Sequence, residues 1–209
     1  IVILVEFSNN EFTVENPHDY FTRLLNEENF SLECGTGSAR DFYISNSSGK
    51  FVPEFDLFGP VKLEHPISYY GQNDSWGNDI RPHEMVIEAC QALDEEVDFS
   101  EYDRDGDGMI DNVYVFYAGF GEADGGASTT IWPHSFDIIS ATNEAYMLDD
   151  VCLNRYACSN ELSYRDKRVD GIGTFTHEFS HVMALPDLYA TSYSSSFTPG
   201  AWNIMDRGS

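Results

Sequence analysis

The segment HEFSHVMALPDLY at residues 177–189 carries two histidines, His177 and His181, four positions apart. Side chains at positions i and i+4 of an α-helix project from one face, and a zinc ion can take two imidazole nitrogens at this spacing. Glu178 stands beside the first histidine, where it can reach a metal-bound water without binding the metal. A proline then ends the helix, and Asp187 follows where the chain can fold back with a third ligand. The pattern predicts a zinc peptidase site in which Glu178 is the general base.

The residues around this segment are typical of a helix with a core face and a metal face. We expect the helix to begin near residues 170–171. At about 100° per residue, its apolar side chains fall opposite the two histidines; they are Phe175, Phe179, Val182 and Met183. The alternative is an ordinary helix with two surface histidines.

A methionine downstream fits the same kind of site. Met205 lies 24 residues after His181, in the segment AWNIMD at residues 201–206. In metzincin peptidases a tight turn that carries a methionine packs beneath three metal ligands, and Met205 fits that role. The alternative is an ordinary core methionine.

Much of the chain resembles the immune inhibitor A family of secreted bacterial metallopeptidases. The segments that carry the resemblance are LVEFS, SARDFY, SSGKF, GPVKLEHPISYYG, DRDGDGMIDNVYVFYAGFGE, IWPH, HExxHxxxxPDxY and WNIMDRGS. The resemblance implies a secreted zinc endopeptidase with a metzincin-like catalytic domain. By matching position, it implies that His177, His181 and Asp187 are the zinc ligands. It also implies that Glu178 is the base and Met205 the residue of the methionine turn.

One position departs from the family pattern. The family has glycine three residues after the second histidine, where the chain turns sharply, and this chain has Ala184. Glycine adopts a positive φ at little cost and alanine does not. Either the turn moves to residues 185–186, or Ala184 is strained. The position of Asp187 depends on which of these holds.

The charge balance of the 209 residues is strongly acidic, with 11 Lys and Arg against 36 Asp and Glu and a formal net charge of −25. Nucleic acid and anionic membranes require a basic patch, so this composition argues against both as partners. It is compatible with a solvated acidic surface, with bound cations or with basic substrates. The chain has no apolar run of about 18 residues, which predicts no transmembrane helix. Its first residues, IVILVEF, are typical of a buried strand, so we expect any signal or pro-segment to be absent from this chain.

The acidic loop DRDGDGMID at residues 103–111 has the spacing of a calcium-binding loop. Carboxylates stand at its relative positions 1, 3, 5 and 9, and a glycine at the sixth allows a tight turn. The expected ligands are the side chains of Asp103, Asp105, Asp107 and Asp111 and the backbone oxygen of Met109. Tyr114 replaces the glutamate of an EF-hand at relative position 12, so a full EF-hand is not expected. We expect a structural calcium; the alternative is a solvated acidic turn.

Four other side chains have two interpretations each. Cys152 and Cys158 flank a five-residue loop and either pair in an oxidising compartment or remain buried thiols. His134 either contacts substrate or a second ion, or is a structural histidine. Tyr189 either stabilises an oxyanion near the metal or packs in the core.

The expected fold is an α/β zincin: a twisted mixed sheet with backing helices, the motif helix across the cleft floor and a short irregular C-terminal lobe with the methionine turn. Strands are predicted at 1–7, 50–58, 61–64 and 113–118, helices at 16–28, 39–46 and 82–97, and loops at 35–37 and 65–80. Residues 140–168 show no clear pattern. We expect residues 1–209 to be one catalytic domain, with an N-terminal lobe to about residue 185 and a truncated C-terminal lobe over 186–209. The substrate-binding edge strand is expected within residues 113–134.

The predicted function is hydrolysis of protein or peptide substrates outside the cell, with zinc as the catalytic cofactor and calcium as a structural one. The alternative is an inactive extracellular binding domain that is stabilised by calcium and keeps the metal. Glu178 separates the two, because a domain that only binds has no need of an acid at that position.

Overall fold

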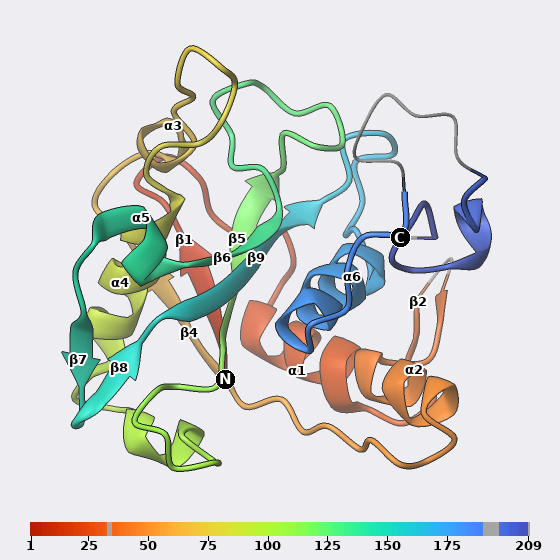
Figure 1. The fold of residues 1–209 in the computed structure, drawn as a ribbon. Helices are drawn as coiled ribbons and strands as arrows, with labels where there is room; N and C mark the ends of the chain where they lie inside the picture. The colour runs from red at the N-terminus through yellow and green to blue at the C-terminus, as the bar shows by residue number, and fades with distance from the viewer. Residues whose placement is uncertain (33–34, 190–196, 209) are drawn as a thin grey trace.

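The computed structural model describes residues 1–32, 35–189 and 197–208, and its centre is a five-stranded mixed sheet (Figure 1). The strand order is β4-β1-β5-β9-β6. The first four strands are parallel, and β6 runs antiparallel to β9 at one edge. The strands span Val2–Glu6 (β1), Leu57–Lys62 (β4), Val113–Phe120 (β5), His134–Asp137 (β6) and Arg155–Leu162 (β9). The predicted class, a mixed sheet with backing helices, is confirmed.

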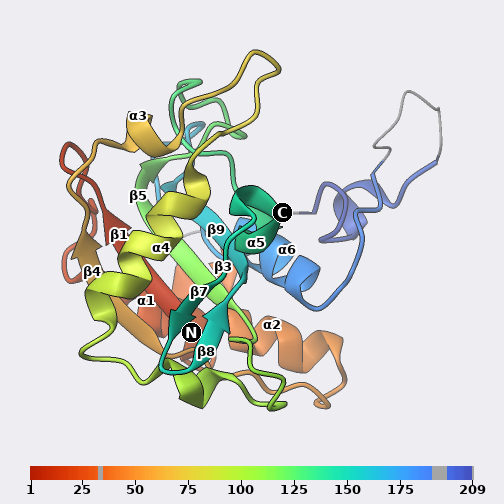
Figure 2. The ribbon, with the colours of Figure 1, turned by 60° about the vertical axis from the view of Figure 1, so that its left-hand side comes forward.

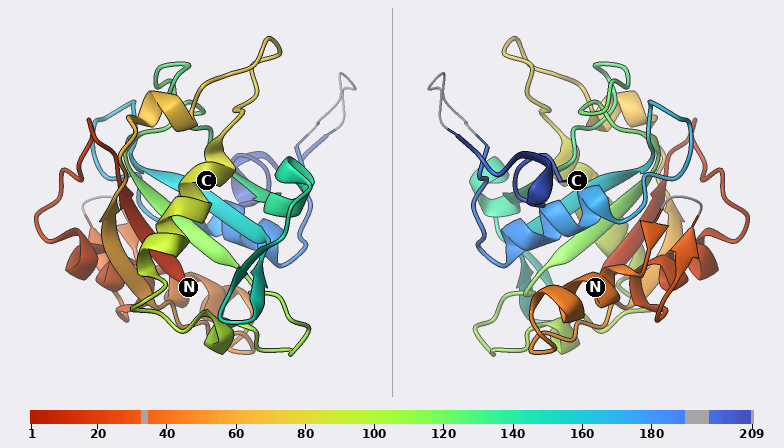
Figure 3. Two further views of the ribbon diagram at one scale, coloured as in Figure 1. Left: turned by 90° about the vertical axis from the view of Figure 1, so that its left-hand side faces the viewer. Right: turned by 90° about the vertical axis from the view of Figure 1, so that its right-hand side faces the viewer.

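Both faces of the sheet are buried, because its parallel strands are apolar on both sides. In β1, Ile3 and Val5 belong to one core cluster, whereas Val2 and Leu4 belong to the other. The first cluster lies under α3 (Ile67–Tyr70), α4 (Pro82–Leu93), η1 (Phe99–Tyr102), α5 (Ile138–Thr142) and the hairpin of β7 (Tyr146–Leu148) and β8 (Val151–Leu153). The second lies under α1 (Pro17–Asn26), α2 (Ala39–Asn46) and α6 (Gly173–Val182). Figure 3 shows α4 across one face and α6 across the other.

The remaining elements are small. Strands β2 (Ser31–Leu32) and β3 (Gly35–Thr36) pair antiparallel, so the first two residues of the loop predicted at 35–37 form a strand, and η2 spans Gly200–Trp202. In Figure 2 the segment that holds η2 lies beside α6, away from β1 and β4. Within the described residues, no helix has the length and apolar character needed to cross a membrane.

Several predicted elements are confirmed, with their ends adjusted. Helix α2 begins where predicted, and Ser38 and Asp41 form a capping box there. Helix α1 begins at Pro17, but Asn16 adopts a left-handed conformation and its side chain makes no capping hydrogen bond. Helix α4 ends at Leu93 instead of residue 97. The next three residues are acidic, and carboxylates are unfavourable at the negative end of a helix dipole.

The two strands predicted on either side of Gly59-Pro60 are a single strand, β4. β4 lies at the edge of the sheet, where a proline removes no ladder hydrogen bond. Gly59 has φ of 90°, and a Cβ there would lie 2.7 Å from the carbonyl oxygen of Leu4. Only glycine fits this close approach of β4 to β1, and the register shifts at the same place.

Residues 140–168, for which no pattern was recognised, contain three strands, and β9 is the important one. Its polar residues Ser159, Asn160 and Glu161 are buried, which hides the apolar pattern of a central strand. The Glu161 carboxylate accepts hydrogen bonds from the backbone N–H groups of Thr13 (2.7 Å) and Gly119 (3.1 Å). Burial of this charge is offset by hydrogen bonds that a sequence pattern does not reveal.

Candidate metal centre and cleft

Helix α6 presents one face to the core and the other to a cleft. The ring of Phe175 packs on Tyr114 of β5 at 4.4 Å between centroids, and Phe179 stacks on Phe175 at 5.7 Å. His177 and His181 lie on the other side, as predicted. Met183 does not join the apolar stripe; it is 37% exposed because the helix ends at Val182.

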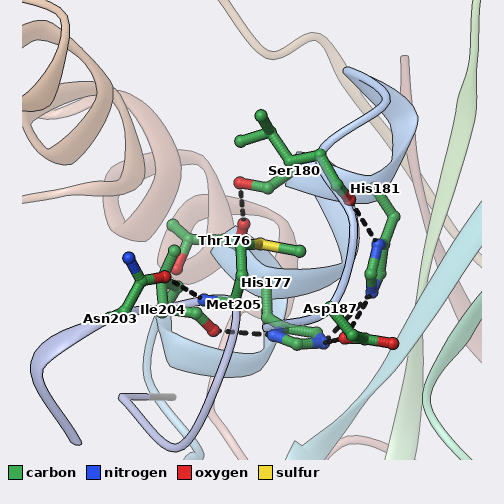
Figure 4. A network of polar contacts seen from close by, with 9 residues as sticks. Thr176, His177, Ser180, His181, Asp187, Asn203, Ile204 and Met205 are labelled. Atoms are coloured by element: carbon green, nitrogen blue, oxygen red, sulfur yellow. Dashed lines mark hydrogen bonds and ion pairs between the residues drawn. The ribbon is translucent and has the colours of Figure 1, made fainter. Parts of the chain in front are cut away.

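Three side chains converge at one point in front of α6 (Figure 4). The Nε2 atoms of His177 and His181 are 3.2 Å apart. The Oδ1 atom of Asp187 lies 3.4 Å from the first and 3.2 Å from the second. A tetrahedral zinc ion with bonds of about 2.0–2.1 Å requires its ligand atoms to be about 3.3 Å apart. The three atoms therefore have the mutual spacing of zinc ligands.

The other nitrogen of each imidazole is held by a backbone carbonyl. Nδ1 of His177 donates to the carbonyl oxygen of Ile204 at 2.7 Å, and Nδ1 of His181 donates to that of Leu185 at 2.8 Å. These bonds fix the tautomer, so both Nε2 lone pairs point at the same space. Oδ1 of Asp187 is buried there with no hydrogen-bond partner. The two Nε2 lone pairs and the unpaired oxygen of Asp187 face one another, and these electron-rich groups repel one another. A cation between them would remove this repulsion, so the three atoms fit a metal ion.

The chain reaches Asp187 through a left-handed turn at Ala184, whose φ is 63°. The N–H of Ala184 donates to the carbonyl of His181, and that of Leu185 to the carbonyl of Ser180. These two bonds form a Schellman motif in which Ala184 occupies the position that glycine usually takes. Of the two alternatives, the structure has the strained alanine, and the turn brings Asp187 to the histidines without a glycine.

Glu178 borders the same space from the next position of α6. A carboxylate oxygen of Glu178 and a ring nitrogen of each histidine lie within 4.8 Å of one another. The side chain is buried, and burial together with the charge of Asp187 raises its pKa to about 8. A positive charge at the histidines would oppose both effects and favour the carboxylate.

Met205 lies in a turn that is hydrogen-bonded to both sides of the site. Its N–H donates to Oδ1 of Asn203 at 2.9 Å, and its carbonyl accepts from the N–H of Leu188 at 2.7 Å. The side chain is buried, and the preceding carbonyl, that of Ile204, holds His177. The turn therefore links the end of the chain to α6 and to the segment that carries Asp187.

A cleft of about 560 Å³ opens in front of these residues. Its opposite wall is the edge strand β6 with the two residues before it, and Arg155 at the start of β9. The edge strand was predicted within 113–134. The part of this range in β5 is wrong, because β5 lies in the middle of the sheet between β1 and β9. The edge strand instead begins at His134 and continues to Asp137.

His134 and Tyr189 also line the cleft. His134 has both ring nitrogens occupied, Nδ1 by the carbonyl of Trp132 at 2.6 Å and Nε2 by the hydroxyl of Tyr156 at 2.8 Å, which favours the structural interpretation. Tyr189 is 41% exposed, so the alternative of core packing is wrong. Burial and the neighbouring carboxylate of Asp187 raise the pKa of Tyr189 to about 12.

The acidic loop lies away from this cleft and is folded around its own carboxylates. Asp103 accepts hydrogen bonds from the N–H groups of Gly106 (2.9 Å) and Gly108 (2.9 Å). Carboxylate oxygens of Asp103, Asp105 and Asp111 lie within 4.8 Å of one another, whereas Asp107 is not in this group. Met109 pairs with Cys152 of β8, which joins the loop to the β7–β8 hairpin.

The predicted alternative of a Cys152–Cys158 disulfide is wrong, because both residues are free, buried thiols. Cys152 lies on β8 and Cys158 in the middle of β9, where its sulfur is 3.6 Å from Nδ1 of His134. The short separation in sequence suggested a loop, but the two residues belong to different sheets.

Sequence reasoning missed two groups of residues at the site. The carbonyls of Leu185 and Ile204 carry no side-chain signal, because any residue supplies a carbonyl. Asp137 and Arg155 face each other across β6 and β9 and line the cleft. Their place at the site follows from the pairing of β6 with β9, which the sequence pattern does not reveal.

Known proteins match this chain over almost all of its length. The family described as Immune inhibitor A peptidase M6, catalytic domain, matches residues 2–209. Two strains of Vibrio cholerae serotype O1 carry a protein named Pre-pro-metalloprotease PrtV that is 29% identical over 220 residues, which cover 92% of this chain and 24% of that protein. A protein of Bacillus thuringiensis subsp. alesti named Immune inhibitor A is 24% identical over 248 residues, covering 100% of this chain and 36% of that protein. The chain thus spans about a quarter to a third of the length of these relatives.

Proposed function

Because this chain belongs to the immune inhibitor A peptidase M6 family, as its catalytic domain, we propose that it hydrolyses internal peptide bonds with zinc held by His177, His181 and Asp187. The observation that carries this proposal is the mutual spacing of 3.2–3.4 Å among the three ligand atoms. When bound, zinc supplies a Lewis acid that polarises the scissile carbonyl and lowers the pKa of water to about 7.

The side chains around the ligands perform the proton transfers and hold the site in place. Glu178 takes the proton of the attacking water and passes it to the leaving amine, since it borders the ligand atoms but stays outside the ligand set. Met205 and its turn support the histidines from below. Tyr189, whose exposed side chain lines the cleft, is placed to donate a hydrogen bond to an oxyanion.

The substrate is an extended protein or peptide segment that pairs with β6. An edge strand offers unpaired backbone groups, and β6 faces the ligands across the cleft. We retain residues 1–209 as one catalytic domain with a division near residue 185, and we place the activity outside the cell. The alternative remains an inactive binding domain that keeps its metal.

A comparison of peptide hydrolysis by the wild type and Glu178→Gln tests this function. Both proteins are loaded with zinc, their zinc content is measured by mass spectrometry, and cleavage of casein and of a quenched peptide is followed. We expect Glu178→Gln to keep zinc and lose about 10²–10⁴-fold in kcat. Glu95→Gln, which changes an exposed glutamate away from the cleft, serves as the matched control. A zinc-loaded wild type as inert as Glu178→Gln would favour the binding domain.

We propose in addition that the acidic loop binds a structural calcium ion through Asp103, Asp105, Asp107, Asp111 and the backbone oxygen of Met109. The supporting observation is that three of these carboxylates lie within 4.8 Å of one another at the surface. Burial and the neighbouring aspartates raise the pKa of Asp111, and a cation among these carboxylates would offset their mutual repulsion. An ion there would stabilise the entry into β5.

A further inference from the structure

Asp137 and Arg155 are directly opposite residues of β6 and β9. In an antiparallel pair, directly opposite side chains project from the same face of the sheet. Residues two apart on a strand share that face, and Ala157 of β9 packs in the core cluster that contains Phe175 of α6. Arg155 and Asp137 therefore project on the side of the sheet that carries the candidate metal centre.

The guanidinium of Arg155 makes one weak contact, with Asp137. Its Nε lies 3.4 Å from Oδ1 of Asp137, and the two side chains are 46% and 35% exposed. Within the described part of the chain, the terminal nitrogens of its guanidinium make no hydrogen bond. An exposed pair at this distance contributes little to stability. The planar donor face of Arg155 is thus available to a ligand in the cleft.

The charge of the cleft makes this arginine distinctive. Among the described residues that line the cleft, the acids are Asp137, Glu178 and Asp187, and Arg155 is the one side chain with a permanent positive charge. The formal net charge of −25 attracts basic peptides and repels acidic ones at long range. Arg155 makes the electrostatic potential in its part of the cleft more positive than that of the surrounding acidic surface.

We propose that Arg155 is a specificity-determining residue that accepts a carboxylate of the substrate, namely an aspartate or glutamate side chain. This inference rests on the proposed peptidase function. A guanidinium binds a carboxylate through two parallel hydrogen bonds, which an amide or a lysine of the substrate cannot reproduce. If the substrate runs antiparallel to β6, its acidic residue lies toward its N-terminal side, because Asp137 and Arg155 stand at the C-terminal end of β6.

Asp137 orients Arg155 and competes with the substrate for it. In the free cleft it holds the guanidinium through Nε, and the terminal nitrogens make no hydrogen bond to the described residues. Its own charge also opposes an incoming carboxylate. Removal of that charge should therefore increase the preference for acidic substrates, and removal of Arg155 should abolish it.

The test measures kcat/KM of the zinc-loaded protein on quenched peptides that carry one Glu, its isostere Gln, or Lys at each position around the cleaved bond. We expect one position at which Glu exceeds Gln by about tenfold. Arg155→Gln should remove this preference, Asp137→Asn should increase it, and Arg165→Gln, an exposed arginine outside the cleft, should leave it unchanged. Peptides with a free or an amidated C-terminus distinguish a side-chain carboxylate from a terminal one.

A binding measurement separates recognition from turnover. The variant Glu178→Ala, titrated calorimetrically with the Glu and Gln peptides, should bind the Glu peptide about tenfold more tightly, and Arg155→Gln in that background should bind both equally. Cleavage with no preference for Glu at any position, or a preference that survives Arg155→Gln, would overturn this inference alone. A wild type that cleaves no peptide would overturn the proposed function and this inference with it.

Discussion

The Nδ1 atom of His177 donates a hydrogen bond of 2.7 Å to the carbonyl oxygen of Ile204. The two residues are 27 positions apart, and Ile204 directly precedes the methionine of the C-terminal turn. The carbonyl of Met205 in turn accepts from Leu188, next to Asp187. One backbone turn therefore orients a ligand imidazole and anchors the segment that carries the carboxylate ligand. The position of both depends on the shape of that turn.

Substitution of Asn203, which shapes the turn, should weaken zinc binding. In Asn203→Ala, the N–H of Met205 loses its acceptor, and the carbonyl of Ile204 is free to move away from His177. Loss of such an indirect support typically costs about 10–100-fold in metal affinity. Competition with a chromophoric chelator measures the affinity. Asn203→Asp, which keeps the acceptor oxygen, should retain most of it, and equal affinities for Asn203→Ala and the wild type would contradict this role of the turn.

The left-handed Ala184 predicts an unusual response to a glycine. An alanine in this region costs about 1–2 kcal/mol, and a glycine adds about 0.4–1 kcal/mol of unfolded-state entropy. The balance predicts that Ala184→Gly raises the free energy of unfolding by up to about 1.6 kcal/mol. Ala184→Val, whose β-branch is less compatible with positive φ, should lower it. Urea unfolding of the zinc-saturated proteins measures both. A glycine variant less stable than the parent would show that the turn is not strained.

Much of this architecture could be predicted from the sequence because local chemistry and fold agree. The apolar first strand, the capping box at Ser38 and the metal-binding helix all follow from short-range patterns, and the predicted family is confirmed. The spacing of His177, His181 and Asp187 also indicated which side chains would meet. The structure adds that they meet at 3.2–3.4 Å.

What could not be predicted depends on tertiary context. β9 was missed because Glu161 is a charge buried at 0% exposure, which a strand pattern does not anticipate. The predicted interruption of the strand at Gly59 is wrong because β4 lies at the edge of the sheet, where a proline is tolerated. Which strand lies at an edge is a property of the whole sheet. For the same reason the cleft strand was placed too early in the chain. The position of Arg155 at the cleft depends on the register in which β9 pairs with β6, where Arg155 lies opposite Asp137.

Calcium should stabilise the wild type much more than it stabilises a variant of the acidic loop. In Asp111→Asn one of the clustered carboxylates loses its charge, so without calcium its melting temperature should equal or exceed that of the wild type. With calcium at about a hundred times its dissociation constant, binding stabilises the wild type by about 2.7 kcal/mol, or about 5–10 °C. The variant should gain much less.

Scanning calorimetry of the zinc-saturated proteins over a calcium series measures the melting temperatures of the wild type and of Asp111→Asn. Asp94→Asn, an exposed aspartate outside the loop, should respond to calcium as the wild type does. Identical melting temperatures of the wild type with and without calcium would indicate a solvated acidic turn.

The pH dependence of stability should carry a contribution from Asp79, whose carboxylate accepts the N–H of Trp132 at 2.8 Å beside the cleft. Burial, with Glu122 nearby, raises its pKa to about 6. Because the folded pKa is above the unfolded value of about 3.9, the folded state binds more protons than the unfolded state at pH values between the two. This contribution is therefore present below about pH 4 and is lost as pH rises through about 6. Because the group is partly exposed, the loss is on the order of 1 kcal/mol.

Asp79→Asn isolates this contribution. The amide keeps an acceptor for the N–H of Trp132 but does not titrate, so the variant should gain stability relative to the wild type as pH rises from about 4.5 to about 7.5. Urea unfolding at these two pH values gives the difference, and the other carboxylates cancel in the comparison. Asp74→Asn is the matched control, because hydrogen bonds from Asn78 and Trp76 lower the pKa of Asp74, so Asp74 is charged throughout this range and its variant should keep a constant difference from the wild type. A constant difference between Asp79→Asn and the wild type across this range would show that Asp79 is charged throughout.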